Sequence, residues 1–311
     1  MRSVGIGRIC PPVLLGVVAA LVLACVSACT PSGPESRIVV TTDILGDIVS
    51  QVVGDEADVT VLMKRNADPH SFGVSARDAH RMRSADLIVY NGLGLEGGVL
   101  HHVEAAAGDG VPALAVGEGI DPLIYRDGDT AGSPDPHFWT DPRRVQSAVG
   151  LIADAVVAGV DGVDAEVVRA RAADYTGRLA RLDEQLAEAF AALPEHRRRL
   201  VTDHHVFGYL AERYGLEVIG AVIPSGTTLA SPSASDLASL AAAIERAAVP
   251  AIFVDTAQPD RLASALATEA GLAVRIVPLY SESLGEPGGE AGTYLDLMRV
   301  NTTRILTALR G

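Results

Sequence analysis

Short apolar runs alternate with amphipathic helical patterns along almost the whole chain after residue 36. The runs expected to form strands are 37–42, 59–63, 87–90 and 113–116 in the first half, and 200–202, 217–219, 251–254 and 273–277 in the second. Helical patterns lie between them, at 44–53, 75–84, 99–107, 207–214, 234–248 and 259–270. Such alternation predicts parallel sheets covered by helices. We therefore expect an α/β fold with two Rossmann-like lobes, each a mostly parallel sheet flanked by helices.

One long helical segment separates the two halves. From Asp164 to Leu193, large apolar residues recur every three or four positions, and Pro194 ends the pattern. A helix of about 30 residues spans about 45 Å, which is long enough to run along both lobes. A dimeric coiled coil is the alternative. We expect a single backbone helix that joins the lobes and restricts hinge opening.

These patterns predict the domain boundaries. The N-terminal lobe is expected at residues 37–155, the long interdomain helix at 156–194 and the C-terminal lobe at 195–311.

The N-terminus resembles a secretory signal. Two arginines precede an apolar stretch, Pro11–Ala24, which is shorter than the ~20 residues of a membrane-spanning helix. Val26-Ser27-Ala28-Cys29 resembles a bacterial lipobox. Residues 1–28 are therefore predicted as a signal peptide, and 29–36 as a lipidated Cys29 with a linker. Cys25 is a second possible lipidation site, and cleavage without lipidation is the alternative.

Composition limits the chemistry of the mature chain. Its three cysteines, Cys10, Cys25 and Cys29, all lie in the leader or at its end. A metal site in the folded part must therefore use histidine and carboxylate ligands. The formal net charge of −14 argues against a nucleic-acid partner, because binding to phosphates needs a basic surface.

Four short segments carry metal-binding types of side chain, each near the end of a predicted strand. They are Asn66–Phe72, Pro134–Pro142, Val201–Tyr209 and Val277–Gly285. Ligands of open α/β sheets bind outside the carboxyl ends of the strands. Two segments come from each half, so all four are expected to converge on a cleft between the lobes.

These segments carry a family resemblance over residues 36–310. The motifs that match in order and spacing are Asp68-Pro69-His70, Asp135-Pro136-His137-Phe138-Trp139, His204-His205-Val206-Phe207-Gly208-Tyr209 and Leu279-Tyr280-Ser281-Glu282-Ser283-Leu284-Gly285. The chain resembles the metal-binding (zinc and manganese) family of ABC-transporter solute-binding lipoproteins, with ZnuA-like and TroA-like members. The resemblance implies a monomeric, extracytoplasmic receptor, lipid-anchored to the outer face of the cell membrane. It would deliver Zn²⁺ to the permease of an importer driven by an ATPase.

By the same resemblance, the metal ligands would be His70, His137, His204 and Glu282. His204 is preferred to His205 because of its distance from the Phe207-Gly208-Tyr209 motif. The family usually has Asp at the fourth position, so either Glu282 or water would complete the site. Three imidazoles and one carboxylate favour Zn²⁺, whereas Mn²⁺ prefers more oxygen ligands. A receptor for manganese or another divalent metal is the alternative cargo.

Nearby carboxylates such as Asp203 are expected to orient the imidazoles, and Phe138 and Trp139 to line the cleft. Zinc-transport relatives often have a His-rich loop before the second ligand, but residues 125–133 contain no histidine.

Other classes of protein remain as alternatives. Gly92-Leu93-Gly94-Leu95-Glu96-Gly97 has the GxGxxG spacing of a dinucleotide site, but it does not follow the first strand of its lobe. A three-histidine zinc site with an open position would suit an exported hydrolase, although HExxH and GxSxG motifs are absent. An adhesin with incidental zinc is a further alternative. We predict that the protein is not an enzyme, and that His80, His101, His102 and His196 lie on the surface.

Overall fold

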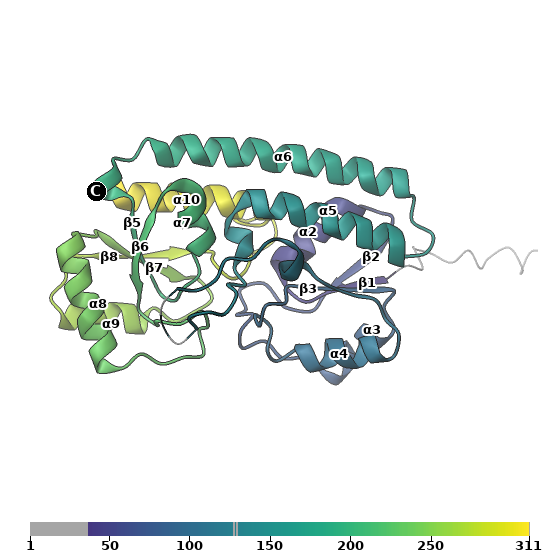
Figure 1. Cartoon of the computed structure of the whole chain (residues 1–311), viewed down its shortest axis with the longest axis horizontal. Helices are drawn as coiled ribbons and strands as arrows, with labels where there is room; N and C mark the ends of the chain where they lie inside the picture. Colours follow the sequence, from purple (N-terminus) through teal and green to yellow (C-terminus); the bar gives the residue numbers. More distant parts are fainter. Residues whose placement is uncertain (1–36, 127, 129, 311) are drawn as a thin grey trace, which may run out of the picture. The chain divides into compact units, whose positions relative to one another are not determined.

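Two four-stranded parallel sheets form the centre of the two lobes (Figure 1). The computed structural model describes residues 37–126, 128 and 130–310. The predicted signal peptide (1–28), Cys29 and the linker to residue 36 lie outside the described residues. The α/β fold with two lobes is as predicted from the sequence.

The N-terminal sheet has the order β2-β1-β3-β4. Its strands are β1 (Arg37–Val40), β2 (Asp58–Val61), β3 (Leu87–Tyr90) and β4 (Ala113–Ala115). Ile38 of β1 pairs with Val59 on one side and Leu87 on the other. From β1 the chain continues to β2 on one side of the sheet, and from β3 to β4 on the other. The position between the central strands β1 and β3 is therefore a topological switch point.

The C-terminal sheet repeats this arrangement in the order β6-β5-β7-β8. Its strands are β5 (Arg199–Thr202), β6 (Glu217–Ala221), β7 (Ala251–Asp255) and β8 (Arg275–Leu279). The last strand ends two residues later than the sequence pattern predicts. Since all pairings in both sheets are parallel, the strands of each lobe end at the same edge.

Helices cover both faces of each sheet because alternate strand residues point to opposite sides. In the N-terminal lobe, Ile38 and Val40 pack with α2, α5 and α6, whereas Val39 packs with α3 and α4. In the C-terminal lobe, Phe253 packs with α6, α7 and α10, and Ile252 with α8 and α9. The bounds are α2 (Asp43–Val53), α3 (Ala76–Arg83), α4 (Leu100–Gly108), α5 (Pro142–Gly159), α6 (Ala165–Ala191), α7 (Gly208–Tyr214), α8 (Ala234–Ala247), α9 (Arg261–Glu269) and α10 (Tyr294–Arg310). Short 3₁₀ helices are η1 (Val116–Gly119), η2 (Phe138–Thr140) and η3 (Glu195–Arg197).

Helix α6 is the predicted long helix, and it extends over both lobes (Figure 1). Its N-cap Asp164 accepts hydrogen bonds from the amides of Glu166 and Val167. Its buried stripe includes Tyr175, Leu179 and Phe190 and belongs to one apolar core that continues from Ile38 in the first lobe to Phe253 in the second. The two lobes are therefore joined by a shared core as well as by the chain.

The helical boundaries differ from the pattern in two places. Residues 156–159 complete α5, and α6 begins only at Ala165. Helices α5 and α10 were not predicted as separate elements. The start of α5 carries a recognisable signal, because Asp141 caps it and Pro142 occupies its first turn. The lobe boundaries at 155 and 195 stay predictions.

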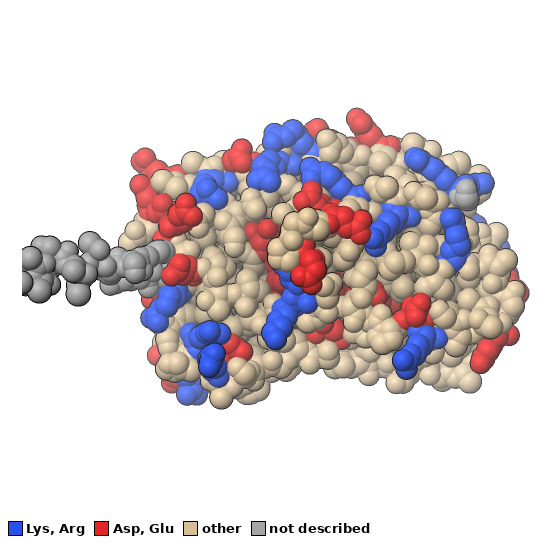
Figure 2. Space-filling view, turned by 180° about the vertical axis from the view of Figure 1, so that it is seen from behind, with Lys and Arg blue, Asp and Glu red and all other residues tan. Residues whose placement is uncertain are grey.

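The surface carries both signs of charge. On the face shown in Figure 2, acidic and basic side chains are interspersed, without one broad basic area. Among the described residues, no helix combines the length and apolarity that crossing a bilayer requires.

Candidate metal centre

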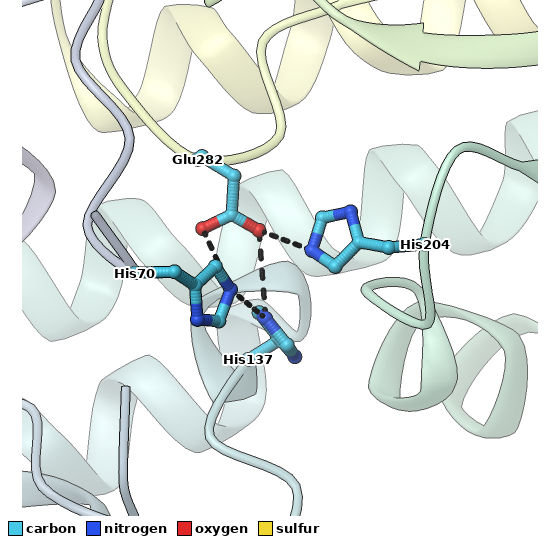
Figure 3. A group of neighbouring side chains, drawn as sticks. All are labelled: His70, His137, His204 and Glu282. Carbon is cyan, nitrogen blue, oxygen red and sulfur yellow. Dashed lines mark hydrogen bonds and ion pairs between the residues drawn. The ribbon is translucent and has the colours of Figure 1, made fainter. Parts of the chain in front are cut away.

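The four predicted ligands lie on separate loops, each after a different strand. His70 lies after β2, His137 lies between β4 and η2, His204 lies two residues after the end of β5, and Glu282 follows β8. Their side chains point towards one place between the lobes (Figure 3). The structure therefore brings together all four residues that the sequence singled out.

Each histidine is preceded by an aspartate that holds its main chain. In every case the carboxylate Oδ1 accepts the histidine's backbone N–H, which closes a tight local turn. The three bonds are Asp68–His70 at 2.9 Å, Asp135–His137 at 2.9 Å and Asp203–His204 at 2.8 Å. The aspartate that precedes each histidine thus fixes the backbone position of that histidine.

The four ligand atoms lie within 4.8 Å of one another. His204 Nε2 is 2.9 Å and His137 Nε2 is 3.4 Å from Glu282 Oε1. His70 Nε2 is 3.3 Å from His137 Nε2 and 4.0 Å from Glu282 Oε2. All four side chains are buried, with exposures of 5, 0, 0 and 1% for His70, His137, His204 and Glu282. Three imidazole nitrogens and a carboxylate therefore surround one small, water-poor point.

Burial and proximity set the charges of these groups. Burial lowers the pKa of His70 to about 4, although Glu282 opposes this effect. Burial raises the pKa of Glu282, but the imidazoles of His137, His204 and His70 outweigh it and hold that pKa at about 2. Burial lowers the pKa of His204, yet Asp203 and Glu282 raise it well above its usual value. Protons on these imidazoles therefore compete with a cation for the same ring nitrogens.

The outer nitrogens of two imidazoles have fixed partners. Asp135 Oδ1 lies 2.8 Å from His137 Nδ1, and the hydroxyl of Tyr125 lies 3.1 Å from the same nitrogen. Asp203 Oδ1 lies 3.1 Å from His204 Nδ1, as expected from the sequence. An Nδ1–H donated to a carboxylate leaves Nε2 free to bind a cation. The roles of Asp135 and Tyr125 were not predicted, although the repeated Asp-Pro-His motif was a signal for the first.

The loop that carries Glu282 is held by Asp255 at the end of β7. The Asp255 carboxylate accepts the backbone N–H groups of Ser281 and Glu282, both at 3.0 Å, and the Ser281 hydroxyl at 2.6 Å. The backbone N–H of Asp255 in turn donates to Asp203 at 2.8 Å. Asp255 therefore connects the supports of two ligands, and no sequence motif indicated this role.

Of the two aromatic residues expected to line the cleft, Trp139 lies beside the site, whereas Phe138 packs in the core. The Trp139 ring lies 5.3 Å from the His137 ring, and its Nε1–H donates to the carbonyl of Ser281 at 2.8 Å. Phe138 is fully buried in the shared core.

The remaining histidines stay outside the cluster. His80, His101 and His196 are exposed and His102 is half-buried. His205 lies beside Tyr125, with 6.4 Å between ring centroids, and is not one of the four grouped ligands.

The GxGxxG segment has a structural role of its own. Glu96, inside the motif, accepts the backbone N–H groups of Asn91 and Gly92 at 2.7 and 3.1 Å and the Thr41 hydroxyl at 2.7 Å. Backbone amides that a dinucleotide pyrophosphate would need are thus bonded to the chain's own carboxylate. This contact argues against the dinucleotide alternative.

Comparison with known families identifies relatives of this chain and of its fold. Residues 38–308 match the family described as "Zinc-uptake complex component A periplasmic". The chain belongs to this family. It is thus a solute-binding component of metal uptake and not an enzyme, as predicted, and the hydrolase alternative is removed.

Individual relatives cover nearly the whole chain. The zinc-binding protein TroA of Treponema pallidum is 30% identical over 307 residues, covering 97% of this chain and 98% of the relative. The manganese ABC transporter substrate-binding lipoprotein PsaA of Streptococcus anginosus is 28% identical, covering 95% and 96%. The solved structure of the periplasmic zinc-binding protein TroA has a TM-score of 0.82 and 29% identity, covering 88% of this chain and 99% of that one. The family and the fold are therefore established, while its members differ in the metal that they bind.

Proposed function

We propose that this chain is an extracytoplasmic receptor that binds Zn²⁺ and delivers it to the permease of an ABC importer. The observation that carries the proposal is the buried group His70, His137, His204 and Glu282, whose ligand atoms lie within 4.8 Å of one another. Bound ions are released to a permease rather than consumed, so the ion is cargo.

The chemistry of the four side chains favours zinc. Ligand atoms held about 2.1 Å from a tetrahedral zinc ion lie about 3.4 Å apart. Four of the observed separations are 2.9 to 4.0 Å, and all the ligand atoms lie within 4.8 Å of one another. Neutral imidazole with a single carboxylate suits Zn²⁺, and leaves a net charge of about +1 at the site. The family description and the zinc-binding relative support the same cargo.

Manganese is the second candidate, and the geometry of Glu282 favours it. Both carboxylate oxygens face the imidazoles, Oε1 towards His137 and His204 and Oε2 towards His70. A bidentate Glu282 would provide two oxygens and a fifth ligand, and more oxygen ligands suit Mn²⁺. Relatives named as manganese receptors support this alternative.

We infer that the receptor acts as a monomer held at the outer face of the membrane through a lipidated Cys29. The lipobox in the sequence and the lipoprotein names of several relatives support the anchor. Its partners would be the permease and its ATPase.

Calorimetric titration of metal-stripped protein (residues 30–311) with Zn²⁺ and with Mn²⁺ tests the cargo. We expect tight binding of one Zn²⁺ per chain and much weaker binding of Mn²⁺. His204→Ala should abolish tight binding, because it removes a buried ligand and the Nε2 that faces Glu282. Glu282→Gln should weaken it strongly, because it removes the negative charge opposite three imidazoles.

His101→Ala is the matched control, since His101 is exposed on α4 outside the cluster, and it should bind as the wild type does. Tighter binding of Mn²⁺ than of Zn²⁺ would replace the proposed cargo. Unchanged Zn²⁺ affinity in Glu282→Gln would show that water completes the site.

A further inference from the structure

Because the four ligands are buried, a metal ion needs a route between solvent and the site. The four ligands are at most 5% exposed, and His70 is the most exposed of them. A hydrated cation cannot reach atoms this deeply buried without a local opening. The contacts that cross between the lobes around the site therefore decide which side opens.

At Trp139 and at Tyr209 these contacts are buried. Tyr294, 0% exposed, donates its hydroxyl to the carbonyl of Trp139 at 2.7 Å, and Trp139 donates to the carbonyl of Ser281. Tyr209, 1% exposed, donates to the carbonyl of Asp135 at 2.7 Å. These bonds join buried aromatic side chains to backbone carbonyls. Opening there would expose apolar surface and leave buried polar groups without partners.

The side next to His70 is closed differently. Thr228 Oγ1 donates to Asp68 Oδ2 at 2.7 Å, and Gln258 Nε2 donates to the same oxygen at 2.8 Å. Thr228 lies between β6 and α8 and Gln258 between β7 and α9, so both bonds reach from the C-terminal lobe to the N-terminal one. Both donors are half-buried side chains, and water can replace their bonds when they break. We call Asp68, Thr228 and Gln258 the latch.

The latch is coupled directly to a metal ligand. Asp68 uses its second oxygen, Oδ1, to hold the backbone N–H of His70. A single carboxylate therefore joins the C-terminal lobe to the turn that carries His70.

The segment that supplies Thr228 is partly exposed. It lies on the side of the molecule opposite α6 (Figure 1), and Leu229 beside Thr228 is 65% exposed. Segments with exposed side chains and few buried apolar contacts open at low free energy.

We propose that the metal ion enters and leaves past His70, through the seam that Thr228 and Gln258 close on Asp68. This inference rests on the proposed receptor function and adds the route of exchange to it. Handover to the permease then requires that this latch open, while the buried aromatic contacts on the other sides stay closed.

The rate of metal release tests the route. Zinc-loaded protein (residues 30–311) is mixed with excess chromogenic zinc chelator in a stopped-flow instrument, and the release rate is measured. Hydrogen bonds to a charged group are worth enough that losing both should accelerate release by about tenfold or more. We expect this acceleration in the double variant Thr228→Val with Gln258→Ala, and a smaller one in each single variant.

Thr227→Val is the matched control. Thr227 is equally half-buried in the same loop, but its hydroxyl accepts the amide of Leu229 and does not contact Asp68. It should release zinc at the wild-type rate. All variants should still bind one ion per chain.

Three results would overturn the route. They are a double variant that releases zinc at the wild-type rate, a Thr227→Val variant as fast as the double variant, and loss of one-to-one binding in the double variant. The last would show that Thr228 and Gln258 belong to the site itself. If wild-type protein binds neither Zn²⁺ nor Mn²⁺, the proposed function fails and this inference falls with it; if it binds and only the rates disagree, the function stands.

Discussion

At the scale of single residues, the site depends on carboxylates that do not face the ion. The carboxylates of Asp135 and Asp203 contact Nδ1 of His137 and His204, so both imidazoles direct Nε2 towards the centre of the site. Partners of this kind fix ring orientation and raise ligand basicity. The ligand set alone would be compatible with many geometries, and these aspartates select one.

Asp135→Asn should lower the zinc affinity by about 10–100-fold. The variant keeps the size of the side chain but loses the negative charge beside His137 Nδ1, which lies 2.8 Å away. Competition titration against a chelator of known affinity measures the change. Asp58→Asn, an exposed aspartate of β2, is the control and should bind normally. Full affinity in Asp135→Asn would mean that Tyr125 alone orients His137.

At the scale of elements, the first turn of α2 is tied to the loop that carries Glu282. Asp43 Oδ2 accepts the Ser283 hydroxyl at 2.6 Å and the Leu284 amide at 2.9 Å. Its buried Oδ1 has no hydrogen-bond partner among the residues that the structure describes. Burial raises the pKa of Asp43 from 3.8 to about 6. The charge of this carboxyl group therefore changes near pH 6, and the contact that it makes between the two lobes depends on pH.

The sign of this sensitivity can be tested by unfolding metal-free protein. Between pH 4 and 6 the folded state binds the Asp43 proton more tightly than the unfolded state does. Stability from this group is therefore present at low pH and is lost as the pH rises through about 6. From pH 5 to pH 7, the wild type should lose about 1 kcal/mol of unfolding free energy relative to Asp43→Asn. Denaturant unfolding at both pH values measures the difference.

Asp174→Asn, on the exposed side of α6, is the control for this experiment and should follow the wild type. Parallel pH dependence in Asp43→Asn and wild type would show that the carboxyl is not perturbed.

At the scale of the whole molecule, α6 and the shared core oppose a large hinge motion. The core contains Ile38 of β1 and Phe253 of β7 in one continuous cluster. Rotating one lobe away from the other would break this packing, which has a cost in buried apolar area. Metal exchange is expected to involve local loop movement instead.

Small-angle scattering tests this expectation. The radius of gyration of metal-stripped protein should stay the same, within error, when one equivalent of Zn²⁺ is added. His204→Ala serves as the variant that cannot respond to zinc. A clear decrease in the wild type on zinc addition would demonstrate lobe closure and contradict the role given to α6.

Much of the fold follows from local patterns. Alternating apolar runs and helical periodicity predicted the two parallel sheets. The interval between large apolar residues predicted a long helix from Asp164 to Leu193, and α6 extends from Ala165 to Ala191. Helix α5 shows the limit, since Asp141 and Pro142 mark its start but its pattern was not separated from the long helix that follows. Residues 156–159 were assigned to the long helix but complete α5, so periodicity alone does not show where one helix ends.

The sequence by itself determined the fold class, because strand and helix periodicity are local properties of the chain. It indicated the four candidate ligands through short motifs that resemble those of a known family. Only the tertiary structure decided how those ligands are supported and enclosed. Asp255 lies 27 residues from Glu282, and Thr228 lies 160 residues from Asp68. Hydrogen bonds across such separations depend on how the lobes pack, and polar residues of these types are common throughout the sequence. Their partners therefore become evident only when the chain has folded.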